Sequence, residues 1–165
     1  DEQDNDLLEF TRTIMWLRRD HPVLRRRRFF TGDAGRGGES ELGEIEWLTP
    51  AGESMTDQDW TTWYARAMMV FLNGEAIAEP DERGQRIVDN SFLVLINASD
   101  EDITFTLPGE GYSPTWKVAL DTAPAVDGDS DPVLAADDTV TVEARSMLFL
   151  MDAPESAATT ERLQR

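Results

Sequence analysis

The stretch that decides the fold is IVDNSFLVLINASDEDITFTLP, residues 87–108, in which two apolar runs flank a short polar turn. Within residues 91–97, residues 92–96 are consecutive large apolar side chains, which is typical of a strand covered on both faces. Residues 103–107 alternate apolar and hydroxyl side chains, which indicates a strand that is wet on one face. The intervening residues 97–100, Asn-Ala-Ser-Asp, supply turn chemistry. We therefore expect a hairpin at the centre of a β-sandwich.

Further elements are predicted on both sides of this stretch. Apolar residues at helical spacing predict an amphipathic helix over residues 4–20, which His21-Pro22 ends. A single helical turn is expected from Thr56 or Asp57 through Trp60. Other strands are expected at residues 44–49, 67–72, 115–121, 139–143 and 146–151, the last two as a closing pair. The fold class is thus all-β, an antiparallel β-sandwich of about seven or eight strands preceded by one N-terminal helix.

The composition excludes several classes of partner and chemistry. The 33 acidic and 15 basic residues give a net charge of −18, which repels nucleic acid phosphates and anionic lipid heads. The absence of cysteine removes disulfides, thiolate zinc sites and cysteine nucleophiles. No apolar run reaches membrane-spanning length and no signal peptide opens the chain, so we expect a cytoplasmic protein.

Three motifs invite a chemical role, and each has a plainer explanation. The single histidine, His21, stands at a helix end, where we expect packing or capping and not catalysis. The four arginines of residues 25–28 are expected to form ion pairs within or between domains, because the surroundings are acidic. Asp127, Asp129 and Asp131 have calcium-loop spacing, but the rest of that motif is missing. We expect neither a metal nor a cofactor.

The candidates for sugar contact are carboxylates and aromatic rings that follow one another closely. Sugars stack on aromatic rings, while carboxylates accept hydrogen bonds from their hydroxyl groups. The alternative, packing of the rings against the sandwich or a neighbouring domain, is favoured because large aromatic side chains are mostly buried. The candidate substrate-binding residues are Asp57, Asp59, Trp60, Trp63 and Tyr64.

Several segments, taken in order, resemble one known group of proteins. They read HPVLRRRRFFTG, EIEWLTPAGESMTDQDWTTWYARAMMVFLNGEAI, RIVDNSFLVLINASDEDITFTLP, WKVALDTA and VEARSMLFL. From about residue 7 to residue 151 the chain resembles the C-terminal end of bacterial glycogen debranching enzymes. These enzymes belong to the isoamylase-like branch of the α-amylase family, glycoside hydrolase family 13.

The resemblance implies a domain plan. Residues 1–28 would be the last helix of a catalytic (β/α)8 barrel with its connector. Residues 29–151 would be the C-terminal β-sandwich domain, and residues 152–165 a flexible tail. Enzymes of this kind hydrolyse α-1,6 branch linkages of glycogen or limit dextrins with an aspartate nucleophile, a glutamate acid/base and a second aspartate.

The catalytic motifs of that family lie upstream of residue 1, so no catalytic residue carries over to this sequence. The resemblance therefore implies a non-catalytic domain that stabilises the barrel and contributes to the rim of its cleft. Its expected partners are the barrel of the same parent chain and the α-glucan substrate. A free-standing carbohydrate-binding module and a protein-interaction β-sandwich remain the alternatives.

Overall fold

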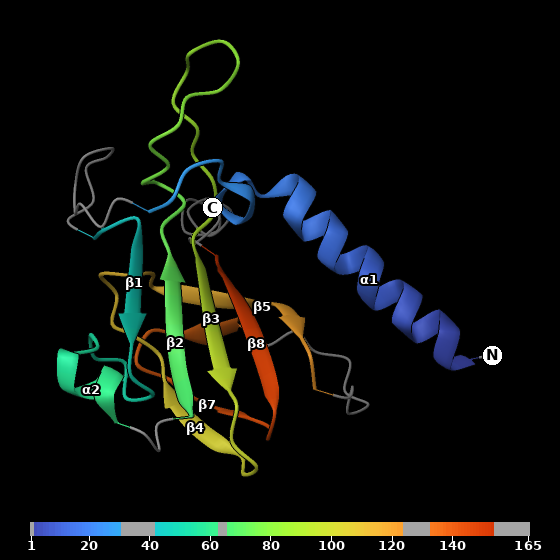
Figure 1. Cartoon of the computed structure of the whole chain (residues 1–165), viewed down its shortest axis with the longest axis vertical. Helices are drawn as coiled ribbons and strands as arrows, with labels where there is room; N and C mark the ends of the chain where they lie inside the picture. Colours follow the sequence, from blue (N-terminus) through green and yellow to red (C-terminus); the bar gives the residue numbers. More distant parts are fainter. Residues whose placement is uncertain (1, 31–41, 63–65, 124–132, 154–165) are drawn as a thin grey trace, which may run out of the picture. The chain divides into compact units, whose positions relative to one another are not determined.

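The structure is a computed structural model that describes residues 2–30, 42–62, 66–123 and 133–153 (Figure 1). Its internal contacts divide the chain into two compact units. The first unit comprises residues 1–45 with 72–91, and the second comprises residues 46–71 with 92–165.

The first unit contains the long helix α1 (Glu2–Asp20) and the 3-10 helix η1 (Pro22–Arg25). Helix α1 ends as predicted, because His21 takes an extended backbone (φ −108°, ψ 101°) before the proline. Of the apolar stripe that defined the helix in the sequence, Leu17 is buried, whereas Leu7 is 65% exposed. The helix thus carries an apolar surface that the described residues leave exposed.

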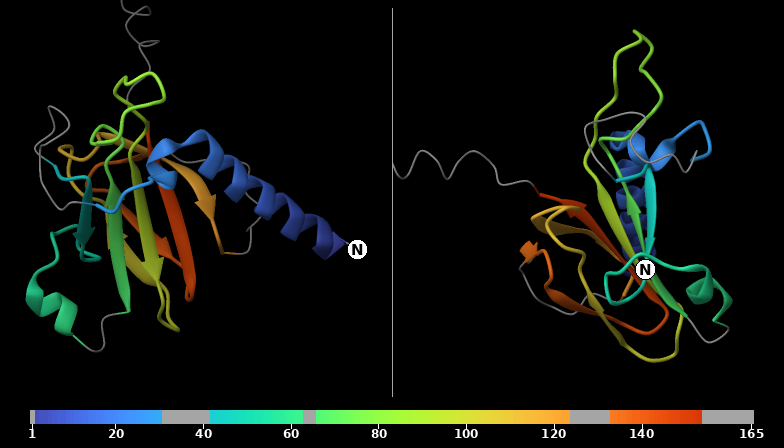
Figure 2. Two further views of the ribbon diagram at one scale, coloured as in Figure 1. Left: turned by 45° about the horizontal axis from the view of Figure 1, so that its top comes forward. Right: turned by 90° about the vertical axis from the view of Figure 1, so that its left-hand side faces the viewer.

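The described part of the second unit is mainly β-structure, with the short helix α2 (Asp57–Thr61) (Figures 1 and 2). In the described residues one sheet has six strands and the other has two, so the predicted all-β sandwich is confirmed. The larger sheet has the order β1 (Ile45–Leu48), β2 (Ala67–Leu72), β3 (Phe92–Asn97), β8 (Ser146–Asp152), β5 (Thr115–Asp121), β6 (Val133–Ala135). The smaller sheet pairs β4 (Ile103–Thr106) with β7 (Thr139–Val142).

The core is organised around β3, as its unbroken apolar run predicted. Phe92, Leu93 and Leu95 are fully buried, and β3 pairs antiparallel with β8 along its whole length. Trp116 of β5 is also fully buried and meets the ring of Phe71 edge to face, with 6.4 Å between centroids. Burial of these large side chains contributes to the hydrophobic stabilisation of the sandwich.

Two predicted strand pairings are wrong. The strands β3 and β4 do not form a hairpin with each other, because β3 pairs with β8 and β4 pairs with β7. For the same reason β7 and β8 are not a closing pair, and each turn carries the chain from one sheet to the other. The short strand β6 was not among the strands expected from the sequence.

The turn after β3 is held by the side chain of Asn97, which is 1% exposed. Its amide nitrogen lies 2.9 Å from the carbonyl oxygen of Glu101 and 3.0 Å from those of Val142 and Glu143, and donates to them. Its amide oxygen accepts a bond of 3.0 Å from the backbone N–H of Ser99. One side chain therefore ties the turn after β3 to the turn after β7.

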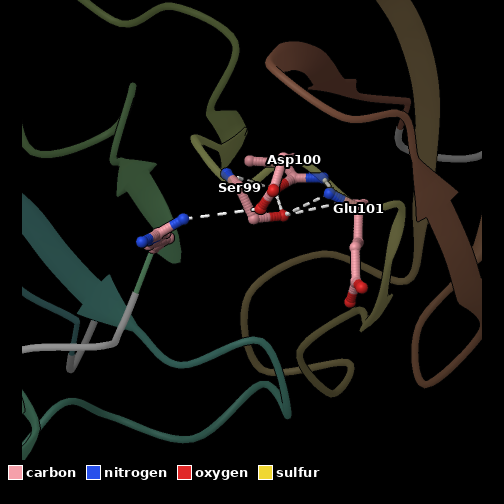
Figure 3. Close-up of polar contacts among 5 residues, drawn as sticks. Ser99, Asp100 and Glu101 are labelled. Carbon is pink, nitrogen blue, oxygen red and sulfur yellow. Dashed lines mark hydrogen bonds and ion pairs between the residues drawn. The ribbon is translucent and has the colours of Figure 1, made fainter.

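Figure 3 shows the rest of this turn, in which Ser99, Asp100 and Glu101 follow one another. The hydroxyl of Ser99 lies 2.6 Å from the carbonyl oxygen of Glu101 and closes the turn locally. The carboxylate of Asp100 faces Arg66 at 3.4 Å, but these side chains are 67% and 59% exposed. Solvent screening makes such a surface ion pair a minor contributor to stability.

In the first unit, Gly74 lies where two backbone segments meet. Its N–H donates to the hydroxyl of Ser91 at 3.1 Å, and its carbonyl accepts from the N–H of Asp89 at 3.1 Å. A Cβ atom at this position would lie 2.2 Å from the carbonyl oxygens of Asp89 and Asn90. The close approach of the two segments therefore requires glycine.

We predict that Gly74→Ala lowers the free energy of unfolding by about 3 kcal/mol or more, because backbone atoms must move to admit the methyl group. Urea unfolding of the purified chain measures this change. Gly111→Ala is the matched control, since its Cβ would have no atom within 4 Å, and it should be nearly neutral. Equal losses for both variants would contradict the steric explanation.

We also predict that Asn97→Ala lowers the free energy of unfolding by about 2–4 kcal/mol, because it leaves buried carbonyl groups without their donor. Asp100→Ala, in the same turn, should cost less than about 0.5 kcal/mol because its ion pair is exposed. Thermal and urea unfolding of the two variants test the difference. A neutral Asn97 variant would show that the two turns hold without the amide.

Candidate functional site

The candidate site is an exposed pair of tryptophan rings in the second unit, Trp47 of β1 and Trp60 of α2. The ring centroids are 5.3 Å apart and the ring planes are inclined at 74°, so one ring meets the other edge to face. Trp47 is nevertheless 39% exposed and Trp60 50% exposed. The Trp47–Trp60 pair thus presents apolar ring surface to solvent in a fixed arrangement.

A tight turn brings the chain back beside Trp47. The carbonyl of Trp47 accepts from the N–H of Met55 at 2.8 Å, and Thr49 N–H donates to the carbonyl of Glu53 at 2.7 Å. Gly52 permits the reversal, because its φ of 84° lies in the left-handed region that side chains disfavour. The segment that leads into α2 is therefore hydrogen-bonded to the strand that carries Trp47.

A capping box then fixes the start of α2. The Thr56 N–H and hydroxyl donate to the Asp59 carboxylate at 2.8 and 2.7 Å, and Thr56 Oγ1 accepts from the Asp59 N–H at 3.4 Å. The Thr56 hydroxyl, and after it the backbone N–H, lowers the pKa of Asp59, because both bonds favour the ionised form. Asp59 therefore positions the helix that carries Trp60.

The predicted sugar-contact residues have four different outcomes. Trp60 contacts Trp47, and Asp57 is exposed in the first turn of α2. Asp59 is engaged in the helix cap, while Trp63 and Tyr64 lie outside the described residues. Sugar contact by this set stays a prediction.

Sequence reasoning missed Trp47 as a site residue and placed it only within the strand expected at residues 44–49. The alternation of side chains along the strand could have identified it. Leu48 is fully buried, so the side chain of the adjacent Trp47 must point to the opposite face of the sheet. What the sequence did not contain was the turn that places Trp60 against it.

His21 has a carboxylate partner that sequence reasoning did not find. Its Nδ1 atom lies 2.8 Å from Asp89 Oδ1, and Asp89 Oδ2 accepts from the N–H of Val23 at 3.0 Å. The edge of the His21 ring also approaches Trp16, with 6.5 Å between centroids. These contacts attach the end of α1 to residue 89, which is the packing role expected for this histidine.

One arginine of the run, Arg26, forms an internal ion pair of the kind predicted. The guanidinium of Arg26 lies 3.5 Å from the carboxylate of Glu44, and both side chains are largely buried. Its Nη2 donates to the carbonyl of Asn73 at 3.0 Å, and the group stacks over the ring of Phe30, 4.9 Å from its centroid. Burial lowers the pKa of Arg26, while the charges of Glu44 and Glu79 act in the opposite direction.

The described residues contain no group of three or more His, Cys, Asp or Glu side chains arranged to hold a metal ion. The calcium-like Asp127, Asp129 and Asp131 lie outside the described residues. Within the described ranges, no helix combines the length and the apolar character needed to cross a lipid bilayer.

Comparison with known proteins gives a consistent set of matches. The family model described as "Isoamylase, C-terminal" matches residues 44–153. A Mycobacterium tuberculosis protein named "Glycogen operon protein GlgX homolog" is 49% identical over 149 residues, which cover 90% of this chain and 20% of that protein. The "Glycogen debranching enzyme" of Dickeya chrysanthemi is 28% identical over 119 residues, 72% of this chain and 14% of that enzyme. This chain therefore spans about a fifth or less of the length of these relatives.

Among solved structures, a pullulanase from an Anoxybacillus species, crystallised with maltotetraose, shares the fold. The TM-score is 0.51 at 11% sequence identity, and the match covers 92% of this chain and 16% of the pullulanase.

The capping box predicts a pH dependence of the Trp47–Trp60 pair. The folded pKa of Asp59 is below its ordinary value of 3.8, so the cap is complete above that value and is lost as pH falls through the folded pKa. We expect the exciton signal of the two indoles in circular dichroism to weaken over that acidic range. Asp59→Asn should weaken it at neutral pH as well.

Asp57→Asn is the control, because it removes a carboxylate from the same turn and leaves the capping box in place. It should keep the exciton signal of the unaltered chain at neutral pH. An Asp59→Asn variant with an undiminished signal would show that the cap does not position Trp60.

Proposed function

This chain belongs to the isoamylase C-terminal domain family, and from that premise we propose that it is the non-catalytic C-terminal domain of a glycogen debranching enzyme. The parent enzyme would hydrolyse α-1,6 branch linkages of α-glucan in a separate catalytic domain, in the cytoplasm. The observation that carries the proposal is the 49% identity over 90% of this chain to a much longer glycogen operon protein homolog.

The carboxylates that the structure places most firmly support a structural role. Asp59 holds a helix cap, Asp89 binds His21 and the N–H of Val23, and Glu44 pairs with Arg26. Each of these carboxylates forms a hydrogen bond or an ion pair with a residue of its own unit. They therefore stabilise the fold, whereas catalysis of glycoside hydrolysis requires two carboxyl groups on either side of the scissile bond.

The surface of α1 supports docking on a catalytic domain. Leu7 and Ile14 recur after about two turns, as do Leu8 and Met15, so they form neighbouring rows along the helix. They are 65%, 41%, 46% and 66% exposed, respectively, and Trp16 in the same helix is 52% exposed. Large apolar patches of this kind on a soluble protein mark an interaction surface.

We therefore assign the parts of the chain as follows. Residues 1–28 form the last helix of the catalytic barrel with its connector, and residues 29–151 form the C-terminal sandwich domain that stabilises the barrel. The tail expected at residues 152–165 lies, from residue 154 onward, outside the described residues.

The test uses the full-length parent enzyme with Leu7→Asp and Met15→Asp combined. We expect a lower melting temperature and slower release of reducing ends from branched glucan, because two charges would enter the domain contact. The 165-residue chain alone should unfold with nearly unchanged free energy, within about 0.5 kcal/mol, since both positions are exposed.

Val133→Asp is the matched control, because Val133 is 58% exposed in β6 of the second unit. It should leave the parent enzyme unaffected. Release of reducing ends by the 165-residue chain alone, or a parent enzyme indifferent to the double variant, would refute the proposal.

A further inference from the structure

We propose that the Trp47–Trp60 pair is a binding surface for linear α-1,4-linked glucan chains. This inference rests on the proposed function, since a debranching parent brings such chains to the domain. It assigns a ligand to a surface of this chain, whereas the proposed function assigns only a structural role.

The first argument is that the two rings are exposed and held in place at the same time. Tryptophan is usually well buried, and an exposed tryptophan on a mobile segment would lose conformational freedom on binding. Here the Trp47 carbonyl bond to Met55 and the Thr56–Asp59 capping box hold the backbone that carries the two rings, and the rings also contact each other edge to face. Such a prearranged apolar surface loses little entropy on binding.

The second argument is the angle between the rings. Successive glucose units of an α-1,4-linked chain turn relative to one another, so the chain curves, whereas a β-1,4-linked chain lies flat. Rings inclined at 74° offer no common plane for a flat chain. They can contact the apolar C–H faces of a curved chain from two directions, and the geometry therefore favours the α-linked polymer.

A carboxylate stands next to the rings for the sugar hydroxyl groups. Asp57 and Trp60 are three residues apart in α2, so their side chains are neighbours on the helix surface. Asp57 is exposed, whereas Asp59 is engaged in the cap. Of the two predicted acids in this helix, Asp57 is therefore the one placed to accept hydrogen bonds from glucose.

The charge of the chain agrees with a neutral ligand. A net charge of −18 repels polyanions such as nucleic acids, while an uncharged polysaccharide carries no such penalty. The competing occupant is another domain of the parent enzyme, which would cover the rings by apolar contact. The experiment below separates these two occupants.

The primary experiment titrates the 15N-labelled chain with maltoheptaose and follows the indole N–H signals of its tryptophans by NMR. We expect the signals of Trp47 and Trp60 to shift with a dissociation constant on the order of millimolar. The signals of Trp16, exposed on α1, and Trp116, fully buried, should stay in place. Cellohexaose, the flat β-linked analogue, should shift none of them.

Variants provide the second measurement, the retardation of the chain in gels that contain glycogen. Trp47→Ala and Trp60→Ala should each raise the dissociation constant for glycogen, derived from the retardation, by about tenfold or more. A tenfold rise corresponds to a loss of roughly 1.4 kcal/mol of binding free energy. Trp16→Ala is the matched control, because Trp16 and Trp60 are 52% and 50% exposed, and it should be retarded like the unaltered chain. Trp60→Phe keeps an aromatic ring and should bind with intermediate strength.

Unmoved Trp47 and Trp60 signals at millimolar maltoheptaose would overturn the inference, and so would an equal loss for Trp16→Ala. Indole signals that respond to maltoheptaose in the 165-residue chain but not in the parent enzyme would assign the surface to a domain contact and also overturn it. The debranching assay of the parent with the α1 variants is independent of these readouts. Failure of the glucan surface is therefore distinguishable from failure of the proposed function.

Discussion

The sandwich depends on the buried amide of Asn97. Its nitrogen donates to carbonyl groups in the turn after β3 and in the turn after β7, and its oxygen accepts from Ser99. Each turn leads from one sheet into the other, so this side chain holds together the places where the sheets exchange strands. Carbonyl groups buried without a donor would cost more than the bonds themselves contribute. The hydrogen bonds from the Asn97 amide to these carbonyl groups therefore stabilise this strand arrangement.

The same constraint recurs where the fold supports a surface. The Thr56–Asp59 capping box satisfies the first N–H groups of α2, and the turn after β1 satisfies the backbone between Trp47 and Met55. The backbone on both sides of the rings is hydrogen-bonded, and the exposed rings contact each other at an inclination of 74°. Local polar bonding thus supports the segments from which the sandwich presents apolar rings to solvent.

The first unit uses charged groups for the same purpose. Asp89 joins His21 to the start of η1, and Arg26 bridges Glu44 and the carbonyl of Asn73. Burying a guanidinium is costly unless its charge and donors are matched, which these contacts achieve. Helix α1 then extends from this anchored end with its apolar rows exposed. An anchored end and an open apolar surface are what docking on a larger enzyme requires.

The sequence by itself determined the local structure and the family. The apolar run of residues 92–96, the alternation of residues 103–107 and the proline after His21 predicted strands and a helix end that the structure confirms. Only the tertiary structure decided that β4 pairs with β7 and that Trp47 meets Trp60. Periodicity depends on near neighbours along the chain, so sequence patterns record it directly. Strand partners and ring contacts depend on how segments that are distant in the sequence pack and hydrogen-bond with one another. A local sequence pattern does not record such contacts.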